Sequence, residues 1–395
     1  MLYRKIFLNS LIAFLLIQAL FHYSDVEMLK YLLYATELSF ILFSLLTVIK
    51  KVPKLTSEIF YLISFSVLVL FNFFVNQQSQ IDDITKIFGG IVIFTASFYL
   101  CRGEYTVKKN ERIKLIFIAF LPFFIFVIDT IFGYKESENA MSIFSNSNNY
   151  IFFSICCIWL MMLYDFSRKM VLSFTALSLA VTSTLGAFLA LNIAAVFYFR
   201  KKIFSPRFFI FFSIAASVGI ILIIYSDLYL FERIRGTANV FYTLISDYNI
   251  NEFADIGFGD AMAMSGSNDG SDVSFLFRIK IWTESLTYFL NQNIIILLFG
   301  LGFGATPEIN SFGLVAHNDY LTWLIEFGFF GFTLIVYGIW KGFLKLKDTI
   351  FIIPYLAILI YFFTENLFYN FFAIAIFSFC LALTLQKIKN ENFTD

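Results

Sequence analysis

The residues best suited to chemistry lie in one stretch, 278–331, which contains Arg278, His317 and Glu326. The guanidinium of an arginine offers the bidentate donor geometry that suits phosphate oxygens. The imidazole of a histidine can accept a proton at neutral pH, as a general base must. A carboxylate within an apolar helix is costly unless it is paired, which makes it a functional candidate. Together, these residues could bind an anionic ligand and move a proton.

Arg278 and His317 also have structural interpretations. Arg278 could form a salt bridge with a neighbouring acid, but it lies four residues before Trp282 and shares a helical face with it, which favours a ligand-binding role. His317 stands in AHNDYL at the start of an apolar helix, where a histidine could instead cap the helix or lie at an interface. The preceding GLGFG favours a site, because glycines let the backbone approach a ligand closely.

Two further acidic positions belong to the same hypothesis. Glu326 lies two to three helical turns into the apolar run after His317, and its expected partner is His317 or an arginine of the segment 230–318. The alternative is a glutamate that only fixes the rotamer of such an arginine. Glu365 and its neighbour Asn366 occupy a predicted turn between the last two apolar runs, from which they could line the same cavity.

Few basic residues occur in the segment 230–318, which is predominantly acidic. They are Arg233, Arg235, Arg278 and Lys280. The three arginines flank a stretch rich in Gly, Ser, Asn and Asp (257–274) that we expect to form a mobile loop. These basic residues are candidates for binding phosphate or pyrophosphate, and salt bridges to the neighbouring acids are the alternative.

Several classes of site lack support in the sequence. There is no P-loop, HExxH motif or dinucleotide-binding glycine pattern, and GLGFG is too short to indicate a nucleotide. The four cysteines lie in apolar runs without the spacing of a zinc site, and we interpret them as core residues. We therefore expect no metal and no cofactor. The net charge of zero gives no argument for nucleic-acid binding.

The composition predicts the elements that must position these residues. With 59% hydrophobic and 14% charged residues, and a mean hydropathy of +0.80, the chain is far more apolar than a soluble protein. Its apolar runs have the length of membrane helices rather than of barrel strands. The fold class is therefore an all-α polytopic integral membrane protein. We predict spans near 6–21, 29–49, 57–75, 84–101, 113–132, 150–164, 208–229, 319–340, 349–367 and 368–386.

Two apolar runs need separate interpretation. The run 171–199 is too long for one span, and we expect two short helices that bend between Thr182 and Gly186, which gives about twelve transmembrane helices in all. The first run resembles a signal peptide, but no cleavage site follows, so we expect it to remain as a helix. The run 279–300 is expected to lie at the outer interface as a helix rather than to cross.

Orientation follows from the basic residues, which are retained on the cytoplasmic side of a membrane. Most of the 28 basic residues fall in alternate loops, which places both termini in the cytoplasm and the segment 230–318 outside. The chain then divides into N-terminal transmembrane helices (1–229), a large outer loop with interfacial helices and the catalytic elements (230–318), and C-terminal transmembrane helices (319–395).

The chain closely resembles the O-antigen ligase and polymerase superfamily of bacterial envelope proteins. The resemblance lies in the motifs FRIKIW, FGLGFG and AHNDYLTWLIEFGFFG, which follow a large outer loop and precede about three spans. The specific match covers Arg278 to Gly331. The resemblance implies a metal-independent glycosyltransferase of the GT-C type in the bacterial inner membrane, with its site facing the periplasm. The implied donor is a glycan on undecaprenyl pyrophosphate. A chain-length regulator protein and membrane lipid are possible partners.

The resemblance also implies residue roles. Arg278 and Arg233, with Arg235 as the alternative to Arg233, would hold the donor pyrophosphate, and His317 would activate the acceptor hydroxyl or orient the phosphate. The family often has Ser-Arg-Gly in the pair of short helices, where this chain has Ser183, Thr184, Leu185 and Gly186. The phosphate contact from that position would be lost or supplied by Lys280 or Arg235.

Alternatives remain open at the level of sequence. The acceptor could be another lipid-linked repeat unit, as in a polymerase, or the lipid A core, as in a ligase; we favour the polymerase. A flippase or other transporter of lipid-linked oligosaccharide would be expected to have two similar halves and charges at the middle of the membrane. The sequence shows no internal repeat, and its unusual charges gather at one predicted face.

Overall fold

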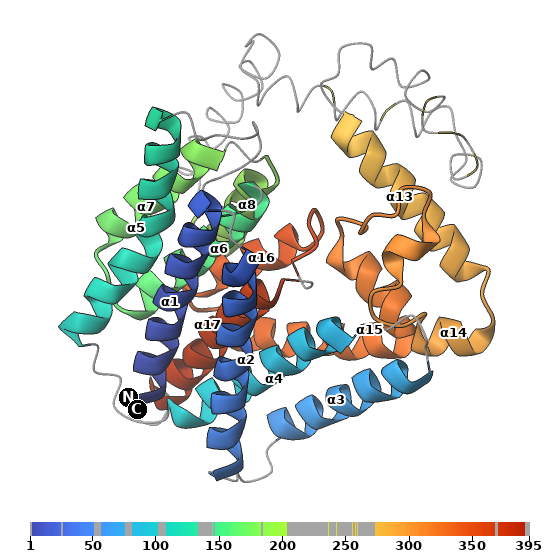
Figure 1. Ribbon diagram of the computed structural model, residues 1–395, viewed down its shortest axis with the longest axis horizontal. Helices are drawn as coiled ribbons and strands as arrows, with labels where there is room; N and C mark the ends of the chain where they lie inside the picture. Colours follow the sequence, from blue (N-terminus) through green and yellow to red (C-terminus); the bar gives the residue numbers. More distant parts are fainter. Residues whose placement is uncertain are drawn as a thin grey trace.

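The computed structural model shows a bundle of helices in the part of the chain that it describes (Figure 1). It describes residues 2–24, 27–50, 57–75, 81–101, 108–132, 144, 147–182, 185–203, 236, 242, 255, 257, 259, 273–367 and 370–391. Every helix or strand element assigned within these residues is a helix. Outside them lie the predicted span at 208–229, Arg233, Arg235, residues 183–184 and most of the predicted loop at 257–274.

The helices of the first half follow the predicted apolar runs, because each run ends where polar residues interrupt it. They are α1 (Leu2–Ser24), α2 (Glu27–Lys50), α3 (Ser57–Val75), α4 (Ile81–Leu100), α5 (Lys109–Phe132), α6 (Ser147–Leu163), α7 (Arg168–Thr182) and α8 (Leu185–Ile203). The run 171–199 contains two helices as predicted, and α7 ends at Thr182, within the predicted bend.

The second half contains α13 (Val273–Leu290), α14 (Ile294–Phe299), the short 3-10 helix η1 (Thr306–Ile309), α15 (Asp319–Leu346), α16 (Ile352–Tyr361) and α17 (Phe371–Glu391). The predicted single helix at 279–300 is instead two helices. Asn293 separates them, because its side chain accepts hydrogen bonds from the N–H groups of Ile295 and Ile296 and so starts a new helix. The helix in the predicted span 349–367 is also shorter than the span, ending at Tyr361.

Within the residues that the structure describes, five helices are long and apolar enough to cross a membrane: residues Tyr3–Ser24, Met28–Ile49, Lys109–Phe132, Asp319–Leu346 and Phe371–Asn390. Four shorter apolar helices accompany them, at Ile63–Phe74, Thr85–Tyr99, Asn148–Leu163 and Ile352–Tyr361. A helix satisfies its own backbone hydrogen bonds, which is what a hydrocarbon environment requires. The structure therefore agrees with a helical membrane protein, and the total of twelve spans stays a prediction.

The core is organised around α6, on which nearly every side chain from Tyr150 to Leu163 is buried. Helix α17 packs on α4 and α6, and α16 packs on α8 and α6, so these helices surround the centre of the bundle (Figure 1). Trp159 of α6 donates a hydrogen bond to Thr384 of α17 at 2.8 Å. A buried indole N–H usually finds such a partner, and this bond fixes α17 relative to α6.

Polar contacts occur at both ends of the bundle, and each joins segments that the charge pattern assigns to the same side. On the predicted cytoplasmic side, Arg4 pairs with Glu111 at 3.7 Å and Arg112 donates to the Tyr164 carbonyl at 3.0 Å. Further pairs there are Lys387 with Asp165 at 3.1 Å and Arg200 with Asp348 at 3.7 Å. On the predicted outer side, His22 lies 3.1 Å from Asp129, and Tyr361 donates to the Asn148 carbonyl at 3.4 Å.

Candidate active site

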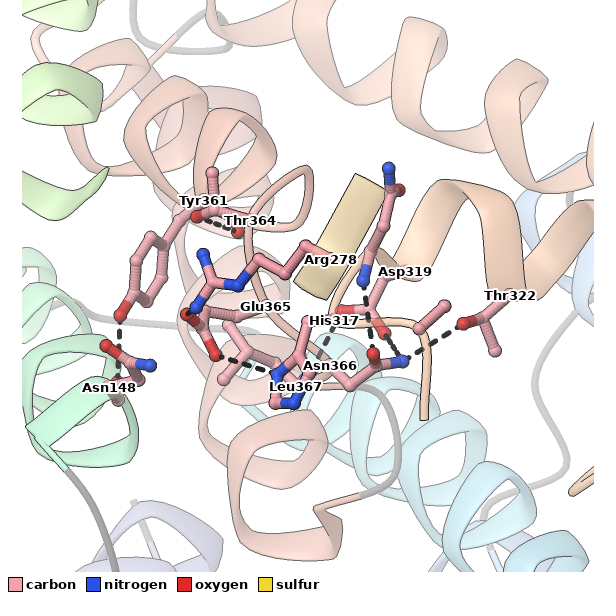
Figure 2. Close-up of polar contacts among 12 residues, drawn as sticks. Asn148, Arg278, His317, Asp319, Thr322, Tyr361, Thr364, Glu365, Asn366 and Leu367 are labelled. Atoms are coloured by element: carbon pink, nitrogen blue, oxygen red, sulfur yellow. Dashed lines mark hydrogen bonds and ion pairs between the residues drawn. The ribbon is translucent and has the colours of Figure 1, made fainter. Parts of the chain in front are cut away.

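The carboxylate of Glu365 lies between an arginine and a histidine from two other parts of the chain (Figure 2). Nη2 of Arg278 is 2.9 Å from Oε1 of Glu365, and Nδ1 of His317 is 3.5 Å from Oε2. Glu365 is 5% exposed, whereas the side chains of Arg278 and His317 are about one fifth and one third exposed. The two residues singled out in the sequence are thus brought together by a third, which the sequence placed only near the same cavity.

Helix α13 positions Arg278 and also supports the loop that carries His317. Trp282, one turn after Arg278, donates from Nε1 to the carbonyl of Ala316. His317 itself has φ of 50°, in the left-handed region that side chains other than glycine rarely adopt. Such backbone strain persists only where surrounding contacts hold it, and it is frequent at functional sites. The indole therefore fixes the backbone immediately before the imidazole.

The residues that follow His317 begin α15 and attach it to the turn after α16. The side chain of Asn318 caps α15 by accepting from the Leu321 N–H at 3.1 Å. The buried carboxylate of Asp319 accepts from the Leu367 N–H at 2.9 Å, and the Asp319 N–H donates to the Phe362 carbonyl at 2.8 Å. These bonds hold the turn containing Glu365 against the loop containing His317.

Asn366 strengthens the same junction. Its Oδ1 accepts from the Asn318 N–H at 3.1 Å, and its Nδ2 donates to Oγ1 of Thr322 at 3.0 Å (Figure 2). An amide that accepts and donates in this way has one orientation. The hydrogen bonds made by the HNDYLT sequence therefore fix the position of the His317 imidazole relative to the Glu365 carboxylate.

Glu326 occupies a different environment from the one expected. It is fully buried, and its Oε1 accepts from Oγ1 of Thr306 at 2.8 Å. The contact is with Thr306 rather than with His317 or Arg278, both of which contact Glu365. Glu326 therefore lies in the packing between η1 and α15, and the structure does not bring it to the imidazole.

Two glycines, Gly300 in the turn before His317 and Gly328 within α15, allow these segments to pack closely. Gly328 has φ of 65° and interrupts α15, and a Cβ there would lie 2.4 Å from the Leu298 carbonyl oxygen. Gly300 has φ of 88°, and a Cβ there would lie 2.1 Å from the Glu326 carbonyl oxygen. The GLGFG turn and the break in α15 thus meet backbone to backbone, joined by the bond from the Leu301 N–H to the Ile325 carbonyl at 2.9 Å. The close approach expected for a ligand is made to α15 instead.

Lys280 points away from Arg278, since residues two apart on a helix do not face each other. Its side chain is 2% exposed and its Nζ lies 3.0 Å from Oε1 of Glu284. Glu284 in turn accepts from the Ser311 N–H at 2.9 Å. Lys280 therefore ties α13 to the loop before His317, and the structure does not place it with the candidate site. The other two candidates for pyrophosphate binding, Arg233 and Arg235, lie outside the described residues.

His317 and Glu365 line a cavity of about 380 Å³. One wall comes from these residues with Val315 and Asn366, and Asn370 and Phe371 of the following segment also line it. The remaining lining residues come from the first half of the chain and are Tyr34, Glu37, Lys86 and Asn149. The cavity lining therefore contains a cation, two carboxylates, an imidazole and several amides, a composition that suits a polar ligand with hydroxyl groups.

The sequence reasoning missed Glu37 and Lys86, although a signal was present. Both lie within predicted membrane spans, where an ionisable residue is a functional candidate by default: Glu37 is near the middle of 29–49, and Lys86 is near the outer end of 84–101. Lys86 is also one of the few basic residues that the orientation places outside the cytoplasm. No motif marks either residue, and only the packing of α2 and α4 brings them to His317.

The arrangement has definite chemical capacities. If Nδ1 of His317 donates to Glu365, Nε2 is left as a proton acceptor, and the carboxylate stabilises the imidazolium that forms. The 3.5 Å separation is longer than a typical hydrogen bond, so Glu365 acts on His317 as a nearby charge. Arg278 uses one of its five N–H donors on Glu365, so others can bind an anion. Among the described residues, no group of three His, Cys, Asp or Glu side chains could hold a metal ion.

Comparison with known proteins adds no assignment. No family model and no curated protein matches the chain. The site formed by Arg278, His317 and Glu365 is therefore the basis for a functional assignment.

Proposed function

We propose that this protein is a multi-pass glycosyltransferase of the bacterial inner membrane. In this proposal it transfers a glycan from undecaprenyl pyrophosphate to a hydroxyl group of another lipid-linked repeat unit, on the periplasmic face, as an O-antigen polymerase does. The observation that carries the proposal is the carboxylate of Glu365, which contacts both the guanidinium of Arg278 and the imidazole of His317 at a polar cavity. The sorting of polar contacts into two ends of the bundle supports the assignment of alternate loops to the same side, and the basic residues supply the orientation.

The reaction follows from these groups. The oxygen of the acceptor hydroxyl attacks the anomeric carbon of the donor sugar and gives its proton to Nε2 of His317. The bond from the anomeric carbon to the phosphate oxygen breaks, and the polyprenyl pyrophosphate leaves with the electron pair. Glu365 stabilises the imidazolium, which later returns its proton to solvent. The transfer is balanced without an oxidant or a further reactant.

Positively charged side chains near the leaving group stabilise the departing pyrophosphate. The pyrophosphate gains negative charge as the bond breaks, so fixed cations lower the barrier. Arg278 provides one cation through its contact with Glu365, which lines the cavity together with His317. Lys86, which lines the cavity itself, provides a second, in the role for which Lys280 or Arg235 was considered from the sequence. Glu37, Tyr34 and Asn149 then face the sugar hydroxyls, for which they offer both acceptors and donors.

The test is the pattern of lipopolysaccharide in a deletion strain that carries plasmid-borne variants. Core that bears a single repeat unit in the deletion strain identifies a polymerase, and bare core identifies a ligase or flippase instead. His317→Ala and Arg278→Ala are expected to fail to restore the glycan ladder at normal expression. His22→Ala is the matched control, because it removes the other histidine of the chain, which contacts Asp129 and does not line the cavity. Full ladders with both site variants would refute the proposal.

A further inference from the structure

A second cavity, of about 410 Å³, lies among α3, α4, α15, α16 and α17 and shares no lining residue with the polar cavity. Most of its lining side chains are apolar, such as Phe94, Ile335 and Leu381. Its volume falls in the range of about 300–1,000 Å³ that is typical of ligand pockets. The cavity is therefore large enough for a ligand and is lined for a hydrocarbon.

Water would be poorly held in this cavity. A buried water needs two to four polar partners, and cavities without them stay dry. The hydroxyl of Tyr355, one of the polar groups in the lining, already donates to the Ile339 carbonyl at 2.7 Å. An empty apolar space of this size forfeits van der Waals contacts along its whole lining. A hydrocarbon chain would restore those contacts.

Two lysines are the only charged residues among those that line the cavity. Lys341 and Lys345 are exposed and lie one turn apart near the end of α15. Like charges at this spacing repel each other, so an anion between them would be stabilising. Nζ of Lys341 lies 5.3 Å from the ring centroid of Tyr337, which also lines the cavity. The dipole of α15 explains cations at its C-terminus but not their place beside an apolar cavity.

The position of the lysines determines which lipid would be bound. Lys341 and Lys345 lie near the end of α15, close in sequence to Asp348, which pairs with Arg200 before α16 begins. Glu365 follows the other end of α16. The ten residues of α16 alone amount to about 15 Å of helix. A donor whose pyrophosphate lies at His317 could not also place it between Lys341 and Lys345. The anion at the lysines therefore belongs to another lipid.

We propose that this cavity binds one acyl chain of an anionic membrane phospholipid, whose phosphate lies between Lys341 and Lys345. Basic pockets between membrane helices on the cytoplasmic side bind anionic head groups in this manner. The ammonium groups attract the phosphate, and the cavity lined by α4, α15 and α17 holds the chain. This inference is independent of the glycosyl-transfer proposal, since it uses none of the residues of the polar cavity.

Native mass spectrometry of the purified full chain tests the inference. The protein is titrated with phosphatidylglycerol and with phosphatidylcholine that carry the same acyl chains. The wild type is expected to bind phosphatidylglycerol about tenfold more tightly, because its headgroup has a net negative charge, whereas the choline ammonium of phosphatidylcholine balances the phosphate and is repelled by the lysines. The double variant K341Q/K345Q should lose this preference. K387Q/K389Q is the matched control, since it removes two cations from the end of α17 that do not line the cavity, and it should keep the preference.

A second variant tests the chain-binding part. Leu381→Trp fills the cavity and should lower the binding of both lipids, with monodispersity and helicity measured to confirm folding. If Leu381→Trp does not fold, K341Q/K345Q still tests the proposal, because both lysines are exposed and their replacement should leave the fold intact. An equal preference for phosphatidylglycerol in K341Q/K345Q and the wild type would overturn the proposal. Displacement of bound lipid by undecaprenyl pyrophosphate, and not by phosphatidylglycerol, would also overturn it, because the cavity would then belong to the substrate.

Discussion

Replacing Glu365 with glutamine tests the joint action of the arginine and the histidine. The substitution keeps the size of the side chain and removes the charge that Arg278 and His317 share at 2.9 and 3.5 Å. An amide that turns its NH2 group toward Nδ1 of His317 would favour the tautomer that carries its hydrogen on Nε2. That tautomer cannot accept the proton of the acceptor hydroxyl.

The size of the effect follows from these two losses. Loss of general-base catalysis typically lowers a rate by about 10²–10⁴. The separation of 3.5 Å between His317 and Glu365 is longer than a typical hydrogen bond, so we expect kcat to fall by about 10²–10³. Removing one partner of a buried ion pair also destabilises a protein by about 3–5 kcal/mol. Water reaches the Arg278 side chain, which is 21% exposed, so the loss of stability should be smaller than that range.

The assay is glycan transfer by purified protein from an undecaprenyl pyrophosphate donor, with kcat and KM measured for donor and acceptor. Glu365→Asp keeps the charge and serves as the control, with an expected kcat between those of the wild type and Glu365→Gln. The double variant E365Q/H317A should be no slower than H317A alone, because residues that act as a unit have non-additive effects. An unchanged kcat in Glu365→Gln, or additive losses in the double variant, would refute the reasoning.

Three further predictions concern other positions. Lys86→Met should raise KM for the donor by about tenfold, whereas Lys86→Arg retains binding, and equal KM values for the two variants would exclude Lys86 as a phosphate contact. Gly328→Ala should destabilise the protein by about 1–3 kcal/mol, because φ is 65° there and the new Cβ would meet the Leu298 carbonyl. Thermal unfolding measures the loss of stability, and an unchanged Tm would contradict the packing described. Glu326→Gln should leave kcat near that of the wild type while it lowers stability by about 1–3 kcal/mol through the weakened contact with Thr306; a large fall in kcat at normal stability would place Glu326 in catalysis.

The helices could largely be predicted from the sequence because apolar runs and the polar residues between them determine where helices begin and end. The break at Asn293 was missed, although the polar residues Asn291, Gln292 and Asn293 interrupt the apolar run there. The interruption of α15 at Gly328 was also missed, because it depends on the backbone of the turn at Gly300 packing against it. Such contacts between distant segments are not visible in local patterns.

The site could be predicted in part. Arg278 and His317 were identified from their types and surroundings, and the structure places both on one carboxylate. The bridging position of Glu365 depends on the turn after α16, which the sequence placed near the cavity without assigning it a partner. Glu326 was expected to contact His317 or an arginine of the segment 230–318, and its carboxylate accepts from Thr306 of η1, whereas His317 and Arg278 contact Glu365. Lys86 reaches the cavity only through the packing of α4.

The most direct test of the account is transfer by the purified protein in lipid nanodiscs, with a labelled glycan on undecaprenyl pyrophosphate as donor and an unlabelled lipid-linked repeat unit as acceptor. The account predicts that the wild type and His22→Ala form a longer labelled glycan and release undecaprenyl pyrophosphate, while His317→Ala and Arg278→Ala form neither product. Transfer by His317→Ala at the rate of the wild type would contradict it.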